Sequence, residues 1–170
     1  MLKGDIPIFG GLYFTKSVPA EPLLYRDFGI SYATDWILGE EVWVKGMGLG
    51  CHMIHRSIME LLYKESEEYS IGTTRLRKVF DTPSENKYDA ETQTWSSSGG
   101  TEDLTFYNRV IEEKILSRAG WPNIQKKKYP FLCDTKIFCK HIDWHGNQYP
   151  ANGEEKQFVK ESNDHRHLRK

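Results

Sequence analysis

The chain lacks any long hydrophobic run, and no apolar stretch approaches the roughly 18 residues that a membrane span requires. It also lacks an excess of charge, because 23 Lys and Arg balance 24 Asp and Glu to give a formal net charge of −1. A dedicated nucleic-acid-binding protein needs a net basic face, so the composition argues against that class. The first residues lack the charged-then-apolar layout of a signal peptide. The 170-residue length and 13% aromatic content instead predict one globular domain with a substantial core.

Cysteine is scarce as well, with three widely spaced residues: Cys51, Cys133 and Cys139. An odd number at this spacing argues against a disulfide framework and predicts a reducing, cytoplasmic location. Cysteines and histidines together do not match structural zinc sites, where paired ligands lie two to four residues apart. A zinc finger is therefore not expected, whereas a single metal-ligating histidine is compatible with the pattern.

Hydrophobic periodicity predicts a mixed α/β fold with two main helices and a small mixed sheet. The expected strands are 6–14, 41–45, 129–133 and 136–142, and the expected helices are 53–65 and the stretch from Thr101 to Gly120. Thr101 is a favourable N-cap and Gly120 a favourable stop signal. The polar stretch 66–100 predicts turns and a flexible hinge rather than regular structure. We expect a main unit of 1–144 and a loosely docked polar tail of 145–170.

Three glycines alternate between the expected strand 41–45 and the helix that follows: Gly46, Gly48 and Gly50. They do not form a dinucleotide-binding fingerprint, which needs the G-x-G-x-x-G spacing at the start of a helix. Two interpretations stay open. The glycines form a structural turn, or they let a sugar or phosphate approach the backbone.

A carboxylate pair, Glu102-Asp103, opens the second expected helix after a Ser/Gly-rich hinge. The positive end of the helix dipole keeps such carboxylates ionised, and an ionised carboxylate can accept a proton from a hydroxyl group. Plain helix capping is the alternative. Trp95 in the hinge has two interpretations as well, a stacking platform for a sugar or a core residue.

These features occur in an order that resembles the C-terminal half of a GT-A-fold, family 2-type glycosyltransferase. The resemblance covers about residues 6 to 143 and is carried by the runs GGLYF, PAEPLLY, VWVKGMGLGCHMI, GGTEDLTFYNRVIEEKILSRAGW and CDTKIFCKHID. It implies an α/β, GT-A-like C-terminal half and an enzyme that transfers a sugar from a nucleotide-sugar donor to an acceptor hydroxyl. The implied reaction is metal-assisted and inverting.

The resemblance also implies residue roles. Asp103 would be the catalytic base, Glu102 would orient the acceptor or the base, and His141 would complete a site for Mn²⁺ or Mg²⁺. The acceptor-facing loop beneath the transferred sugar would be lined by Gly48, Gly50 and Cys51. The expected partners are a nucleotide-sugar donor and a glycan or other hydroxyl acceptor.

Enzymes of this family hold the nucleotide on an N-terminal half that carries a D-x-D motif, and this chain contains no D-x-D. We therefore expect the donor-binding half to be missing from this chain, through truncation, supply by a separate chain, or loss. The chain alone is expected to show weak or no transfer. The two alternatives are a non-catalytic carbohydrate- or partner-binding remnant and a metal-binding structural module that uses the Cys/His group.

Overall fold

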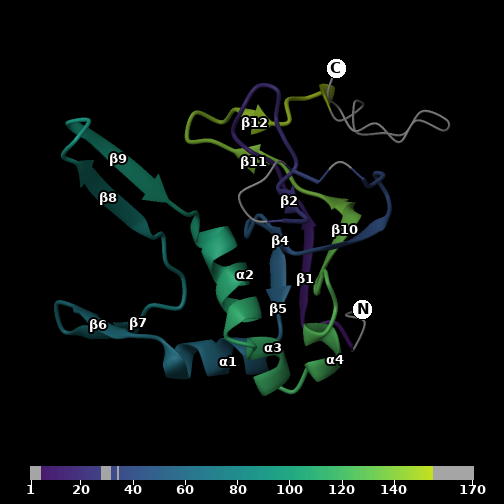
Figure 1. Ribbon diagram of the computed structural model, residues 1–170. Helices are drawn as coiled ribbons and strands as arrows, with labels where there is room; N and C mark the ends of the chain where they lie inside the picture. The colour runs from purple at the N-terminus through teal and green to yellow at the C-terminus, as the bar shows by residue number, and fades with distance from the viewer. Residues whose placement is uncertain (1–4, 28–31, 34, 155–170) are drawn as a thin grey trace.

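A four-stranded mixed sheet forms the centre of the computed structural model, which describes residues 5–27, 32–33 and 35–154 (Figure 1). The side chains of 84–87 and 95–99 also lie outside the description. The strand order is β3-β10-β1-β5, with β1 parallel to β10 and antiparallel pairs at both edges. The strands are β1 (Ile8–Leu12), β3 (Glu41–Val44), β5 (His52–Ile54) and β10 (Phe131–Phe138).

Helices cover one face of this sheet and lie at its lower end in Figure 1. Within the described residues they are α1 (Arg56–Glu65), α2 (Glu102–Glu112), α3 (Ile115–Arg118) and α4 (Pro122–Gln125). Tyr107 on α2 is fully buried, and its ring centroid lies 4.6 Å from that of Phe131 on β10. The predicted mixed α/β class with a small mixed sheet is confirmed. In the part of the chain that the structure describes, no helix is long and apolar enough to cross a membrane.

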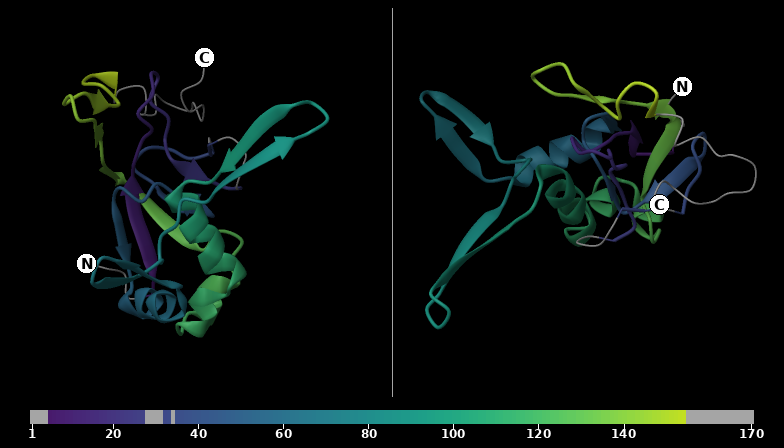
Figure 2. Two further views of the ribbon diagram at one scale, coloured as in Figure 1. Left: turned by 90° about the vertical axis from the view of Figure 1, so that its left-hand side faces the viewer. Right: turned by 90° about the horizontal axis from the view of Figure 1, so that it is seen from above.

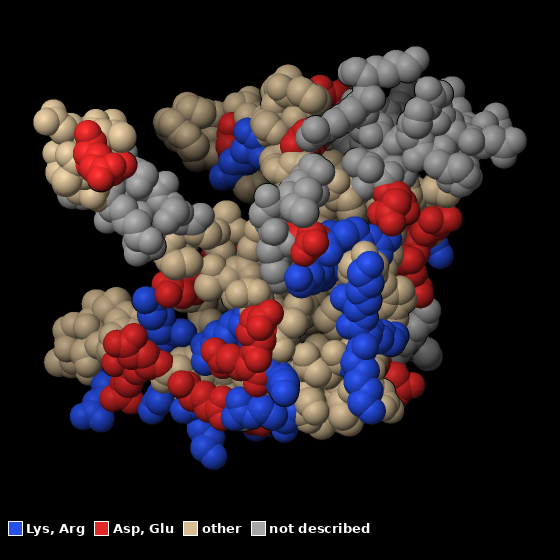
Figure 3. Space-filling model, viewed as in Figure 1, with Lys and Arg blue, Asp and Glu red and all other residues tan. Residues whose placement is uncertain are grey.

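Four two-stranded hairpins or ribbons complete the described chain. They are β2 (Leu24–Tyr25) with β4 (Gly46–Met47), β6 (Glu68–Ile71) with β7 (Thr74–Arg77), β8 (Ser84–Asp89) with β9 (Thr94–Gly99), and β11 (His141–Ile142) with β12 (Gln148–Tyr149). The β6–β7 and β8–β9 hairpins project from the body as two separate arms (Figure 2). Lys and Arg side chains are mixed with Asp and Glu at the lower left of the body, whereas a continuous column of Lys and Arg runs down its right side (Figure 3).

Two helical expectations need correction. The expected helix at 53–65 begins later, because His52–Ile54 pairs with β1 as strand β5 and His55 then caps α1 by accepting from the backbone N–H of Ser57. The expected helix from Thr101 to Gly120 is interrupted at Lys114, which has a left-handed backbone with φ of 54°. The interruption separates α2 from α3 and lets α3 turn under the sheet.

Two other expectations were also wrong. The stretch 66–100 was expected to contain turns and a hinge, yet it forms the β6–β7 and β8–β9 hairpins. The two strands expected at 129–133 and 136–142 are mainly one strand, β10, which pairs with both β1 and β3. The expected boundary between 144 and 145 falls in the β11–β12 turn. That domain division stays a prediction, and residues 155–170 lie outside the description.

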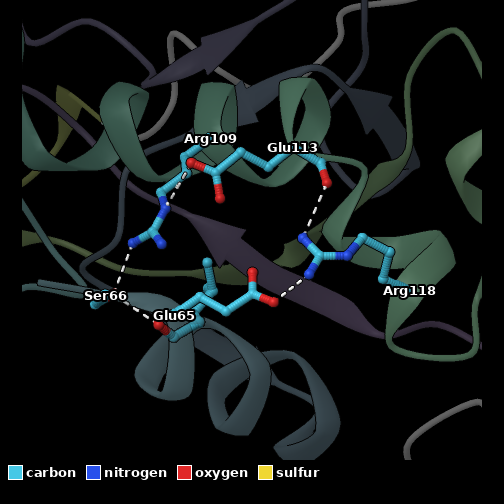
Figure 4. A network of polar contacts seen from close by, with 6 residues as sticks. Glu65, Ser66, Arg109, Glu113 and Arg118 are labelled. Atoms are coloured by element: carbon cyan, nitrogen blue, oxygen red, sulfur yellow. Dashed lines mark hydrogen bonds and ion pairs between the residues drawn. The ribbon is translucent and has the colours of Figure 1, made fainter.

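A polar network joins the end of α1 to α2 and α3 (Figure 4). The guanidinium of Arg109 donates to Ser66 Oγ at 2.8 Å and to Glu113 Oε1 at 3.0 Å. Arg118 pairs with Glu65 and also donates to the backbone carbonyl of Glu113. Because Ser66 is 4% exposed, its hydroxyl is the buried centre of this network.

Ser66→Ala is expected to lower the free energy of unfolding by about 1–2 kcal/mol, because Arg109 loses a buried acceptor. The Ser66 hydroxyl also donates to the backbone carbonyl of Leu62 at 2.6 Å, and this bond is lost too. Urea denaturation followed by circular dichroism measures the change. The exposed Ser117→Ala serves as the control and is expected to stay within about 0.5 kcal/mol. Equal stability of both variants would contradict a structural role for the network.

Candidate functional site

Tyr13 lies at the centre of the candidate site, directly after β1 and close to the start of α2. The glycine loop packs against its ring. A Cβ atom added at Gly50 would lie 2.3 Å from ring atoms of Tyr13, and one added at Gly48 would lie 3.1 Å from its Cδ1. A side chain at Gly50 would have to displace the tyrosine, whereas one at Gly48 would first meet Leu23 Cδ1, at 2.8 Å. The glycines therefore have a definite packing role, which is the structural-turn interpretation of the sequence.

His141 covers Tyr13 from another direction. The two ring centroids are 4.9 Å apart with an interplanar angle of 24°. The Nδ1 atom of His141 lies 3.3 Å from the backbone carbonyl of Phe14, which can only accept, so Nδ1 carries the proton in this contact. In a neutral ring Nε2 is then the unprotonated nitrogen, the arrangement found in histidines that ligate metals.

Asp103 occupies the second position of α2 and is half-buried. Burial raises the pKa of its carboxyl, the backbone N–H of Leu49 opposes this rise, and the charge of Glu102 adds to it. The N-cap of α2 is Thr101, whose side chain accepts from the backbone N–H of Leu104. Because a threonine already caps the helix, the Asp103 carboxylate is not needed for that purpose. Glu102 is exposed to solvent.

Three tyrosines lie within electrostatic range of the Asp103 carboxylate: Tyr13, Tyr25 and Tyr107. Burial is the main reason that the pKa of each phenol is raised, and the negative charge of Asp103 contributes to every one of the three shifts. All three phenols are therefore protonated at neutral pH.

His52 links the sheet to α2 just below this carboxylate. Its Nε2 makes a short hydrogen bond to the hydroxyl of Tyr107, one helical turn after Asp103. Burial lowers the pKa of His52 from 6.5 to about 4, and the backbone of Leu49 opposes this shift. Its buried Nδ1 makes no hydrogen bond among the described residues. The imidazole is thus neutral at pH 7 and fixes the α2 turn that carries Asp103.

The buried His52 is expected to make the protein less stable as the pH falls from about 6.5 to about 4. A lowered folded-state pKa means that the unfolded chain binds more protons in this window, so stability is present above pH 6.5 and is lost toward pH 4. The full difference corresponds to about 3 kcal/mol. Urea denaturation at a series of pH values measures it. His52→Gln should lose this pH-dependent part of the stability, whereas His145→Gln, a change at an exposed histidine, should keep it. Identical pH profiles for the wild type and His52→Gln would show that His52 is not the source of the pH dependence.

The three cysteines lie close to one another, near Gly11 of β1. Cys51 Sγ would lie 3.1 Å from a Cβ atom added at Gly11, and the Cys51 and Cys139 side chains are hydrogen-bonded. Burial and the contact with Cys51 raise the pKa of Cys139 to about 11, and burial raises that of Cys133 to about 12. Cys133 and Cys139 are therefore neutral thiols at physiological pH, and all three cysteines are free.

The described residues do not assemble a metal centre. Among them no group of three or more His, Cys, Asp or Glu side chains could hold a metal ion. His141 by itself offers one nitrogen, which does not fit the six oxygen-rich ligands that Mg²⁺ or Mn²⁺ prefers. The expected metal role of His141 therefore has no partner ligands within the described part of the chain.

The structure brings most of the predicted site residues to one place around Tyr13: Gly48, Gly50, Cys51, Asp103 and His141. Glu102 borders this place on the solvent side. Trp95 belongs to β9, but its side chain lies outside the described residues. Sequence analysis missed Tyr13 itself. The available signal was the Gly10-Gly11 pair just before it, because paired glycines in a strand mark a close approach.

No protein-family model, curated protein or solved structure matches this chain.

Proposed function

We propose that this chain is the acceptor-binding, catalytic half of a GT-A-like glycosyltransferase. The observation that carries the proposal is Asp103, a half-buried carboxylate at the start of α2 that does not cap the helix and whose pKa is raised. A carboxylate with a raised pKa is a stronger general base than an ordinary one. The hydroxyl of the partly exposed Tyr13, beside this carboxylate, would suit a polyhydroxylated acceptor.

In the proposed reaction the acceptor hydroxyl donates its proton to Asp103 while its oxygen attacks the anomeric carbon of the donor sugar. The new bond joins the acceptor oxygen to that carbon, and the bond from the carbon to the donor phosphate breaks. The leaving diphosphate takes the electron pair, and the proton resides on Asp103 until it passes to solvent. Attack opposite the leaving group inverts the anomeric configuration. Glu102, exposed beside the base, would orient the acceptor.

Several parts of the proposal rest on the resemblance and the composition. The nucleotide-sugar donor would be held by a donor-binding half outside this chain, because no D-x-D motif is present. A Mn²⁺ or Mg²⁺ ion belongs to the proposal as a companion of the donor diphosphate, with His141 offering at most one ligand, and no step is derived through it. A cytoplasmic location is proposed from the three free cysteines.

The alternative is a non-catalytic carbohydrate- or partner-binding protein. It is favoured by the tight packing of Gly48 and Gly50 on Tyr13, which gives the loop a purely structural explanation. Calorimetric titration with nucleotide sugars and Mn²⁺, in the presence of a donor-binding half, separates the two when it is followed by a transfer assay. We expect weak or no heats from the chain alone, and sugar transfer once a donor-binding half is supplied. Absence of transfer when the donor-binding half binds nucleotide sugar and Mn²⁺ would favour the non-catalytic alternative.

A further inference from the structure

Trp144 in the β11–β12 turn is the most exposed large hydrophobic side chain that the structure describes, at 89%. Most tryptophans bury much of their ring, because that ring supplies a large apolar area. An indole held almost entirely in water is therefore a candidate contact surface for something outside the chain.

The turn that carries Trp144 is rigidly built around one carboxylate. Asp143 accepts hydrogen bonds from the backbone N–H groups of His145 and Asn147, both at 2.9 Å, and from the Asn147 amide at 2.9 Å. It also accepts from the hydroxyl of Tyr149 at 3.2 Å. These bonds lower the pKa of Asp143, so it stays ionised and the turn stays closed near neutral pH. A side chain on such a turn loses little further freedom on binding, which favours affinity.

The indole has one covered face and one open face. The His145 ring centroid lies 3.5 Å from that of Trp144 at an interplanar angle of 36°, so His145 supports the indole from one side. Because Trp144 is nevertheless almost fully exposed, the opposite face is open to solvent. The negative face of an aromatic ring attracts the positive C–H edge groups that a pyranose presents on its apolar side. Polar groups at the rim, His145 and Asn147, suit the hydroxyl groups at the edge of such a sugar.

This turn is connected to the candidate site. His141 at the start of β11 pairs with Tyr149 of β12 and stacks on Tyr13. In Figure 1 the β11–β12 hairpin lies above the start of α2. A sugar ring on Trp144 would therefore stand on the hairpin that contacts Tyr13 through His141.

We propose that Trp144, supported by His145, is a stacking platform for a pyranose ring of the acceptor, at a subsite beyond the sugar that reacts. This proposal rests on the proposed function for its place in the reaction, and it makes the acceptor an oligosaccharide or a glycoconjugate with more than one sugar. A lipid surface is the competing occupant for an exposed indole. The ionised Asp143 and the polar His145 and Asn147 in the same turn favour the sugar.

The test is an NMR titration of the indole N–H resonances of the five tryptophans. The probes are the methyl pyranosides of glucose, galactose, mannose and N-acetylglucosamine. We expect at least one of them to shift the Trp144 resonance, assigned by its loss in Trp144→Ala, with saturation in the millimolar range that suits a single sugar ring. Trp144→Phe keeps an aromatic ring at this position and should therefore still bind the glycoside. Binding by this variant is measured by saturation transfer from the protein to the glycoside, which should persist in Trp144→Phe and disappear in Trp144→Ala. Tyr63→Ala, which removes an exposed aromatic ring from α1, should keep the full response.

Three results would overturn the platform: no shift with any of the glycosides, equal shifts of all the indoles, or saturation transfer undiminished in Trp144→Ala. Co-sedimentation with vesicles of anionic phospholipid that is lost in Trp144→Ala, without a glycoside response, would assign the indole to a membrane surface instead. Asp103→Asn should leave the glycoside titration unchanged. If Asp103 is shown not to be the base, the assignment of Trp144 as a stacking platform is unaffected. If Trp144 is shown not to bind glycosides, the role of Asp103 is still decided by the transfer assay on Asp103→Asn.

Discussion

Asp103→Asn is expected to lower kcat for sugar transfer by about 10²–10⁴-fold, with donor affinity nearly unchanged. The amide cannot take the proton from the acceptor hydroxyl, and a general base acts only in the transition state. The carboxylate is suited to that role because burial raises its pKa and because Thr101 already caps the helix. The measurement is steady-state transfer from a nucleotide sugar, with the donor-binding half supplied in the same or a separate chain.

Stability provides the matching control for this variant. If Asp103 served mainly to complement the helix dipole, Asp103→Asn would cost about 0.3–1 kcal/mol of stability and little activity. The base assignment predicts the reverse. Removing a partly buried charge whose pKa is raised should leave stability at pH 7 unchanged or higher, while kcat falls. Near-normal kcat would show that Asp103 is not the base, and Glu102→Gln would then be the next variant to measure.

Tyr107→Ala is expected to lower the free energy of unfolding by about 3–5 kcal/mol, the range for deleting a large buried ring. Tyr107 is completely buried, with 0% of its surface accessible to solvent. Its ring packs on Phe106 and Phe131, and its hydroxyl bonds to His52. Its loss leaves a cavity between α2 and the sheet and leaves the buried Nε2 of His52 without its partner. Urea denaturation at pH 7 measures the change.

Two variants bracket this result. Tyr107→Phe keeps the ring and loses only the hydroxyl, so we expect a cost of about 1–3 kcal/mol from the unsatisfied His52 nitrogen. Tyr63→Ala removes a tyrosine ring that is 55% exposed and is expected to cost much less than Tyr107→Ala. If Tyr107→Ala were no more destabilised than Tyr63→Ala, the packing of α2 on the sheet described above would be wrong.

The parts of the fold that sequence analysis predicted are those with a strong apolar pattern. Strand β1 lies inside the expected strand 6–14, and β3 nearly coincides with 41–45, where alternating valines face the core. The start of α2 was also predicted, because Thr101 is a clear N-cap signal. The break at Lys114 was not predictable. Lysine has no preference for a left-handed backbone, and the apolar stripe continues past it into α3.

The projecting hairpins were missed for a different reason. Strands β8 and β9 carry mostly polar side chains, so they show no alternation of apolar and polar residues from which a strand could be recognised. Their pairing is local and does not depend on burial against the sheet. The same lack of apolar periodicity was interpreted as a hinge. Polar arms of this kind are where pattern analysis is weakest.

Within the site, residue types were predicted better than their arrangement. Asp103 and His141 were singled out from a motif, but no spacing in the sequence places both of them near Tyr13. The parallel pairing of β1 with β10, more than a hundred residues apart along the chain, brings His141 there, and the packing of α2 brings Asp103. The neutral state of His52 has the same origin, because its pKa depends on a helix that packs over it.

The pKa of Asp103 tests the central claim most directly. It can be measured on the chain alone by following the side-chain carboxyl carbon in an NMR titration, with Asp103→Asn providing the assignment. The account predicts a pKa above the ordinary value of 3.8, because the half-buried carboxylate at the start of α2 is a poised base. A value at or below 3.8 would show a carboxylate stabilised by the helix N-terminus, and it would contradict the assignment of Asp103 as the base.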